Sequence, residues 1–347
     1  MPTPLERLMT TLSHQEGDRI PIFPVMLQHG AKELGVSLEE YFTNGEMLAE
    51  GQTRLIEKYE HDAVIGVPHV VEDLLAFGQK LVYFPNGAPV LGGMAISRYH
   101  QIDSLEVKDP TEVPELRETL RAIELLAKRF KGTVPIFGAG IAPFSLPSMF
   151  IGTEKWLQLL FDEPDLREQY ITRFLELSMD FCVNWMNLQI EAGADAVVIA
   201  DGMASATILL REQFQAWAMP LIKITISRIK GPVVYEGVGS LGQFADLLPE
   251  LGAVAVILDR HDDMAQCKQA LQGKVTVVGN INNIALIDWT PEKIEQEVKA
   301  VCDAAKHGGG FVLANQGPEI PYDVPDENIR AFVEAGKKWG RHNGAVV

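Results

Sequence analysis

The chain has 347 residues, of which 47% are hydrophobic and 22% are charged, and its formal net charge is −17. This length allows one large core or two domains of ordinary size. The acidic balance, uninterrupted by any basic cluster, disfavours binding to nucleic acid. No apolar run approaches the ~20 residues of a membrane helix, and residues 1–7 do not resemble a signal peptide, so we expect a cytoplasmic protein without a membrane partner. The cysteines lie far apart in helix-like stretches, which favours burial over a disulfide or a zinc site; they are Cys182, Cys267 and Cys302.

Short apolar, β-branched runs alternate with longer amphipathic stretches along the chain. Strands are predicted at residues 20–26, 62–67, 134–138, 194–200, 231–235, 253–258, 275–279 and 310–314. Helices are predicted between them, including residues 114–130, 164–191, 211–228, 241–251 and 291–307. Eight strand–helix units favour a parallel sheet closed into a (β/α)8 TIM barrel.

The chain is longer than the ~250 residues that such a barrel usually needs. We therefore expect one barrel domain over residues 1–347, with an N-terminal helical extension and a small insertion. Turn signals within residues 81–94 predict a hairpin between the second and third barrel units. A doubly wound open sheet is the alternative, but no glycine-rich phosphate loop follows an early strand.

Polar residues follow most of the predicted strands, at the end where barrels of this kind place their active sites. Helix capping explains any single one of them, including Asp201 after the buried run 194–200. Capping does not readily explain why three of the eight histidines occupy these positions. The other five histidines are expected on the surface or in loops. The polar set comprises Gln28, His29, His69, Glu72, Asp73, Asp201, Glu236, Asp259, Arg260, His261, Asn280, Asn282, Asn283, Asn315 and Gln316.

Glu236 and His261 are the strongest candidates for chemistry. Glycines flank Glu236 on its C-terminal side, where they let a backbone approach a ligand, so its carboxylate is a candidate metal ligand or general acid. His261 is a candidate ligand or proton donor. A zinc site needs three protein ligands, and His29, His69 or Asp201 would have to supply the third.

Several segments resemble the uroporphyrinogen decarboxylase superfamily, in matching order and spacing over almost the whole chain. They are residues 19–21 (Arg-Ile-Pro), 26–30 (Met-Leu-Gln-His-Gly), 142–146 (Ala-Pro-Phe-Ser-Leu), 150–152 (Phe-Ile-Gly), 191–195 (Glu-Ala-Gly-Ala-Asp) with Asp201, 278–280 (Val-Gly-Asn), 315–317 (Asn-Gln-Gly) and 325–329 (Pro-Asp-Glu-Asn-Ile). The resemblance implies a (β/α)8 barrel. The arginines with which the decarboxylase motif holds an acidic tetrapyrrole are replaced by Leu27 and Ala31, and its catalytic aspartate by His69. Fixed cations are needed for a substrate with many carboxylates, so these departures from the motif argue against the decarboxylase itself.

The superfamily's other branch contains corrinoid-dependent methyltransferases. Members that methylate thiols hold zinc with His-x-Cys after the fifth strand and a Cys after the eighth. Residues 236–238 and 316–318 replace these motifs and contain no Cys, so thiol activation of that kind is not expected. The resemblance instead implies transfer of a methyl group from a donor, an aryl methyl ether, to the Co(I) of cobalamin on a separate corrinoid protein.

In this O-demethylase reading, the catalytic residues are Asp201, Glu236, His261 and His69, with Glu236 and His261 as candidate zinc ligands. Flat aromatic and other side chains would bind the small-molecule methyl donor, although at strand or helix spacing such residues also serve as plain core. Decarboxylation, a methylamine or betaine donor, a non-catalytic binding barrel and a homo-oligomer stay open. The candidate substrate-binding residues are His29, Phe144, Met203, Tyr235, Asn280 and Gln316.

Overall fold

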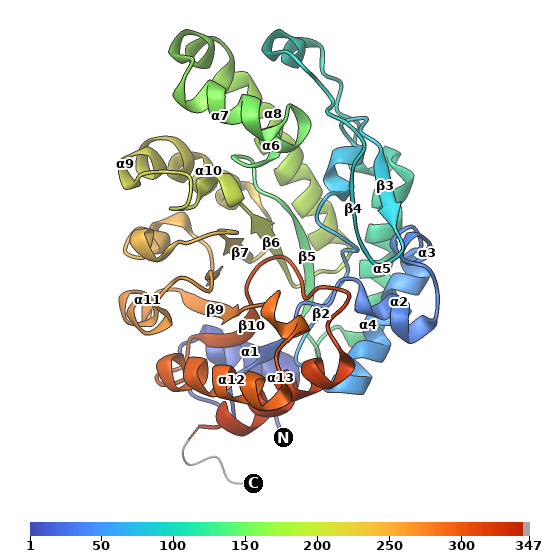
Figure 1. Cartoon of the computed structure of the whole chain (residues 1–347), viewed down its shortest axis with the longest axis vertical. Helices are drawn as coiled ribbons and strands as arrows, with labels where there is room; N and C mark the ends of the chain where they lie inside the picture. The colour runs from blue at the N-terminus through green and yellow to red at the C-terminus, as the bar shows by residue number, and fades with distance from the viewer. Residues whose placement is uncertain (343–347) are drawn as a thin grey trace.

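The computed structural model describes residues 1–342 and contains an eight-stranded parallel sheet surrounded by helices (Figure 1). The order β1-β10-β9-β8-β7-β6-β5-β2 follows the chain around the sheet once the hairpin β3–β4 is set aside. This arrangement confirms the predicted TIM-barrel-like fold. The barrel strands are β1 (Ile22–Phe23), β2 (Val64–Ile65), β5 (Ile136–Ile141), β6 (Ala196–Ala200), β7 (Val233–Glu236), β8 (Ala255–Ile257), β9 (Thr276–Ile281) and β10 (Phe311–Asn315).

The helices follow the predicted alternation with two differences. Residues 241–251 form two short 3-10 helices, Gly242–Phe244 and Leu248–Leu251, because Pro249 lacks the N–H that a continuous helix would use. Residues 211–228 contain a π-helical turn, Phe214–Ala218, just before Pro220. The helices are α1 (Pro4–Leu12), α2 (His29–Leu34), α3 (Leu38–Phe42), α4 (Gly45–Tyr59), α5 (Pro114–Phe130), α6 (Leu146–Phe150), α7 (Thr153–Phe161), α8 (Pro164–Ala192), α9 (Arg211–Gln213), α10 (Met219–Arg228), α11 (Met264–Leu271), α12 (Pro291–Ala305) and α13 (Asp326–Trp339).

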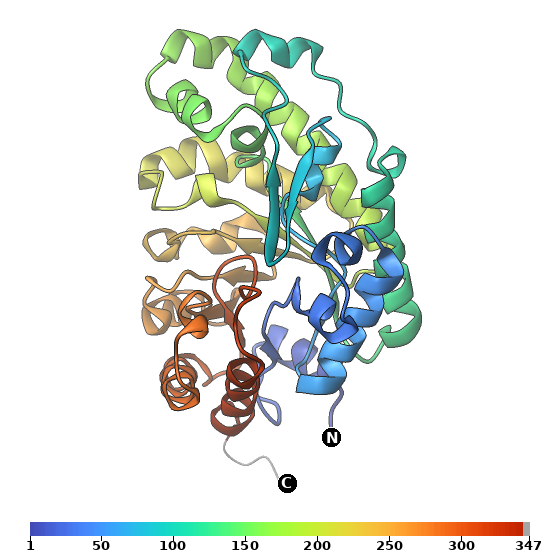
Figure 2. The ribbon, with the colours of Figure 1, turned by 45° about the vertical axis from the view of Figure 1, so that its right-hand side comes forward.

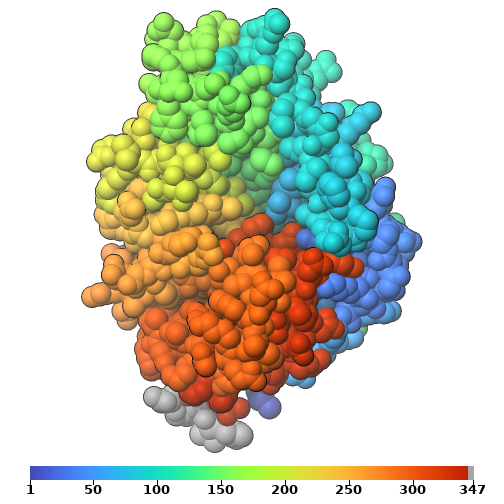
Figure 3. Space-filling model, viewed as in Figure 1, coloured from blue at the N-terminus to red at the C-terminus, as the bar shows by residue number. Residues whose placement is uncertain are grey.

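The predicted insertion is the antiparallel hairpin of β3 (Leu81–Phe84) and β4 (Gly87–Leu91). Its two strands stand in front of the barrel sheet in Figure 2. Tyr83 of this hairpin and Tyr322, which follows β10, pack against the same small core around Tyr41 and Phe42. In the space-filling view the hairpin and the segment after β10 adjoin one another (Figure 3). The insertion therefore lies over the end of the barrel where β10 terminates.

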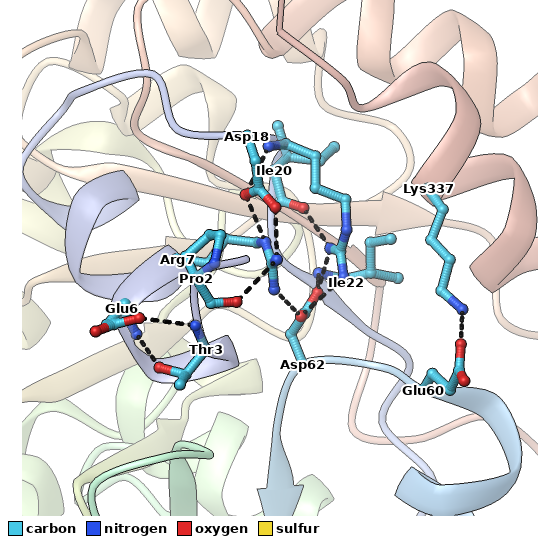
Figure 4. Close-up of polar contacts among 11 residues, drawn as sticks. Pro2, Thr3, Glu6, Arg7, Asp18, Ile20, Ile22, Glu60, Asp62 and Lys337 are labelled. Carbon is cyan, nitrogen blue, oxygen red and sulfur yellow. Dashed lines mark hydrogen bonds and ion pairs between the residues drawn. The ribbon is translucent and has the colours of Figure 1, made fainter. Parts of the chain in front are cut away.

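Asp62 joins the first and second barrel strands, between which no ladder forms within residues 1–342. Its backbone N–H donates to the carbonyl of Ile22 at 2.8 Å, and its Oδ2 accepts the Ile22 N–H at 2.7 Å. The guanidinium group of Arg7 pairs with the same carboxylate at 2.7 Å (Figure 4). The guanidinium group of Arg19 pairs with it at 2.5 Å. His61 lies in a loop, one of the two locations expected for it, but its side chain is buried beside this network. A paired, buried carboxylate thus closes the N-terminal end of the barrel.

Side chains along the barrel strands alternate between two cores. Inward residues such as Val198, Val234 and Val312 form a cluster inside the barrel, and α1 packs Leu8 and Leu12 against it. Outward residues pack against the helices in a second, larger cluster. The predicted N-terminal helical extension is therefore α1, which lies against the inside of the barrel.

Burial of the three cysteines is confirmed, and all three are free thiols. No helix within residues 1–342 combines the length and the apolar character that crossing a membrane requires.

Candidate active site

A cavity of about 150 Å³ runs along the inside of the barrel. Leu8 and Leu12 of α1 line it at the N-terminal end, whereas His69, Glu236 and Asn315 line it at the C-terminal ends of their strands. Most of the other lining side chains are apolar, and no Lys or Arg of residues 1–342 is among them. We refer to this cavity as the lumen.

Glu236 is the last residue of β7, and the strand's alternation turns its side chain into the lumen together with that of Val234. The side chain is 4% exposed, and Oε1 has no hydrogen-bond partner among the described residues. Burial raises the pKa of Glu236 to about 7. At neutral pH this carboxyl group is therefore present in both protonation states, as a general acid or base requires.

His69 supplies a neutral imidazole to the same lumen. It is 2% exposed, its Nδ1 has no hydrogen-bond partner within the described chain, and burial lowers its pKa to about 3. Its ring meets Phe42 edge-on, with 5.0 Å between the ring centroids. This packing holds the ring in place while one nitrogen stays free for a ligand.

Asp73 also lines the lumen, but both of its oxygens are occupied. Oδ2 accepts the backbone N–H of Ile141 at 2.7 Å, and Oδ1 accepts the indole N–H of Trp185 at 3.0 Å. Burial raises its pKa to about 7 despite these bonds. Asp73 was in the predicted polar set without a role, and its contacts fit the positioning of the loop after β2.

Asp201 lies on the other face of the sheet from Glu236. The inward residues of β6 are Ala196, Val198 and Ala200, so the next residue turns outward, and Asp201 is fully buried outside the lumen. Its Oδ1 accepts the hydroxyl of Ser145 at 2.5 Å.

Burial raises the pKa of Asp201 to about 7. Burial and the neighbouring Asp201 together raise the pKa of Tyr235 well above its usual value. Asp201 makes no capping hydrogen bond to the short helix that follows it. Ser145 completes this outward group. It lies within the family-like segment 142–146, but the sequence analysis did not single it out as a site residue.

His261 does not line the lumen. Its side chain is 67% exposed, and its Nδ1 lies 2.6 Å from Oδ1 of Asp259. Asn280 donates to the carbonyl of Asp259 at 2.8 Å, and Gln316 accepts the backbone N–H of Arg260 at 3.1 Å. The structure therefore places Asn280 and Gln316 as supports of this loop.

The three remaining predicted residues also lie outside the lumen lining. Phe144 is fully buried against Trp156, with ring centroids 5.9 Å apart, and Met203 packs on the same core. His29 begins α2 and is buried, with both ring nitrogens unpartnered among the described residues, and burial lowers its pKa to about 3. Glu319, which the sequence did not single out, is half-buried, and burial raises its pKa to about 7.

The residues present do not fit the predicted zinc site. Within residues 1–342 no three His, Cys, Asp or Glu side chains are grouped so as to hold a metal ion. Glu236 points into the lumen, whereas His261 is exposed to solvent. Zinc binding by this pair is therefore not supported by their placement.

Comparison with known proteins identifies the family. Residues 3–339 match the family model described as Uroporphyrinogen decarboxylase (URO-D). The chain belongs to the uroporphyrinogen decarboxylase family. It is 25% identical to the uroporphyrinogen decarboxylase of Psychromonas ingrahamii over 95% of this chain and 96% of that protein, and 27% identical to that of Mannheimia succiniciproducens over 86% and 84%.

Two solved structures share this family member's fold. A methyltransferase from Methanosarcina mazei superposes with a TM-score of 0.85 at 21% identity, covering 98% of this chain and 99% of that one. A B12-independent methionine synthase from Shewanella sp. W3-18-1 superposes with a TM-score of 0.56 at 14% identity, covering 93% and 95%.

The two positions where this uroporphyrinogen decarboxylase family member lacks the arginines of the decarboxylase motif are apolar in the structure. Leu27 lines the lumen, and Ala31 is buried in the small core beside Tyr41. Neither residue brings a cation to the site. The lumen of this chain thus lacks the charge that a substrate with many carboxylates would need.

Proposed function

We propose that this protein is a methyltransferase that takes a methyl group from an aryl methyl ether and passes it to the Co(I) of a corrinoid on a separate protein. Family membership and the fold shared with a methyltransferase are consistent with this proposal. The observation that carries it is Glu236, a buried carboxyl group with a pKa of about 7 at the end of an apolar lumen. Such a group can protonate a leaving oxygen at neutral pH.

In the proposed reaction, the carboxyl group of Glu236 donates its proton to the ether oxygen while the bond between that oxygen and the methyl carbon breaks. The products are a phenol and the Glu236 carboxylate, which then recovers a proton from water. The electron pair for the new bond to the methyl carbon comes from the Co(I) of the corrinoid, which is the methyl acceptor. The lumen, at about 150 Å³, is too small for a corrinoid ring. The corrinoid must therefore approach the C-terminal end of the lumen while bound to its carrier protein. In this proposal, neutral His69, which lines the same lumen, holds the substrate oxygen by a hydrogen bond.

The proposal is tested by mixing the purified protein with cob(I)alamin and a panel of methoxyarenes, methylamines and glycine betaine. We expect methoxyarene-dependent loss of the Co(I) absorption and release of the matching phenol. Methylation with only the amines or betaine would show that the methyl donor is not an aryl ether. No methylation with any donor would refute the proposal. Release of carbon dioxide from uroporphyrinogen would restore the decarboxylase alternative, against which the absence of Lys and Arg from the lumen lining argues.

A further inference from the structure

The lumen is open in a region that barrels of this kind normally fill. Large branched side chains in stacked layers usually occupy the inside of a (β/α)8 barrel. Here alanine occupies several of the positions that line the lumen, and these short side chains leave the space unfilled. The lining alanines are Ala63, Ala139, Ala196, Ala200, Ala255 and Ala314.

The open space reaches into the barrel beyond Glu236. Phe23, Ala139 and Ile257 belong to the inner face of the sheet and line the lumen, yet each keeps part of its surface exposed. That exposed surface faces the lumen because inward side chains have no other open space beside them. Phe23 and Phe137 stack within this region, with ring centroids 5.3 Å apart and an interplanar angle of 21°. The region therefore offers flat apolar surface to a ligand.

The size and polarity of the lumen determine which ligands fit it. An apolar protein cavity of ~150 Å³ stays dry and takes up benzene, because water finds no hydrogen-bond partners there. The lumen has a similar volume, and its unpartnered polar atoms among the described residues belong to Glu236 and His69 near its C-terminal end. An apolar ring with one oxygen substituent matches this distribution.

The charge of the lining excludes anions. The acids Asp62, Asp73, Asp195 and Glu236 line the lumen, and no Lys or Arg of residues 1–342 does. Burying a carboxylate without a cation carries a large desolvation cost. An arene bearing a carboxylate would meet this cost, whereas an uncharged arene would not.

We propose that the lumen binds the ring of an uncharged monocyclic arene, with its oxygen substituent at Glu236, and rejects arenes that carry a carboxylate. This inference rests on the proposed function, because it names the class of methyl donor. It predicts turnover of anisole-type and guaiacol-type ethers in preference to methoxybenzoates.

Binding is tested without any methyl acceptor, by fluorine NMR with fluorobenzene and 4-fluorobenzoate as probes. We expect saturable binding of fluorobenzene, displaced by anisole, and binding of 4-fluorobenzoate at least tenfold weaker. Ala139→Leu extends a side chain into the lumen and should weaken fluorobenzene binding at least tenfold. Ala300→Leu makes the same change on the exposed face of α12 and should leave binding unchanged. Ala200→Leu serves as a second lumen variant if thermal unfolding shows that Ala139→Leu does not fold.

The inference is overturned if fluorobenzene does not bind, if 4-fluorobenzoate binds as well, or if folded lumen-filling variants bind like the wild type. The outcome separates from that of the proposed function. Arene binding without methyl transfer to cob(I)alamin would keep the lumen site and refute the methyltransferase. Methyl transfer without fluorobenzene binding would support the methyltransferase and refute the arene site in the lumen.

Discussion

The two ends of the barrel differ in whether their buried titratable side chains have polar partners. At the N-terminal end, the carboxylate of Asp62 is paired with Arg7 and Arg19 and also accepts a backbone N–H. At the C-terminal end, Glu236 and His69 are as deeply buried but have unpartnered polar atoms among the described residues. Satisfied groups of the first kind hold a fold together, whereas shifted, unpartnered groups of the second kind are typical of functional sites.

The difference also has an energetic cost. A carboxyl group whose pKa is raised by burial makes the folded state less stable at neutral pH than at low pH. Glu236 and Asp73 at the C-terminal end both have pKa values of about 7. Burial of these carboxyl groups therefore lowers stability at the end where chemistry is proposed, whereas the deeply buried ion pairs of Asp62 lie at the other end.

Glu236→Gln should have the largest effect on activity. The amide keeps the shape of the side chain but cannot donate a proton to an ether oxygen, so methyl transfer to cob(I)alamin should fall by about 10²–10⁴-fold. Asp201→Asn is the matched control, because Asp201 is equally buried but lies outside the lumen; it should lower the rate less than tenfold. Equal losses in the two variants would contradict the distinction between the two faces of the sheet.

Arg7→Ala should have the largest effect on stability. Removing this guanidinium leaves Asp62 buried with one cation fewer, and breaking a buried ion pair typically lowers the free energy of unfolding by about 3–5 kcal/mol. Arg129→Ala is the control, because Arg129 pairs with Glu57 on the surface and such pairs contribute about 1 kcal/mol or less. Urea unfolding of both variants measures the difference, and a similar loss in each would contradict the structural role of the buried network.

The pH dependence of the free energy of unfolding should reveal the burial of Glu236 at the C-terminal end. The pKa of Glu236 is raised from 4.5 to about 7 on folding, so its contribution to the free energy of unfolding is fully present below pH 4.5. This contribution is lost as pH rises from 4.5 to about 7, and the loss amounts to about 3 kcal/mol. In Glu236→Gln this part of the decline should be absent, so the two unfolding curves should diverge across that range. Parallel curves would show that Glu236 titrates as an ordinary exposed carboxyl group.

Sequence periodicity was sufficient for the fold but only partly for the site. Eight β-branched runs with helices between them determine a barrel, and the strand tips then follow. Whether a tip residue faces the lumen depends on strand parity: Glu236 ends its strand in the inward register, and Asp201 follows its strand in the outward one. That register is readable from sequence only when the last strand residue is known to within one position.

Loop geometry limited the rest of the prediction. His261 follows β8 at a strand tip, as predicted, but the loop turns its ring outward toward Asp259. No spacing rule in the sequence determines the direction of a side chain on such a loop. Asn280 and Gln316 support this loop through hydrogen bonds to its backbone, which a sequence pattern does not reveal.

His261→Ala should therefore have the smallest effect. The side chain is 67% exposed and does not line the lumen, so the rate of methyl transfer should change less than twofold. Its contact with Asp259 at 2.6 Å is exposed, and such a pair adds little stability. His69→Ala removes a buried imidazole of the lumen and provides the contrast, with an expected loss of at least tenfold. If His261→Ala were as damaging as His69→Ala, the loop after β8 would have to close over the mouth during catalysis, and the active site would extend beyond the lumen.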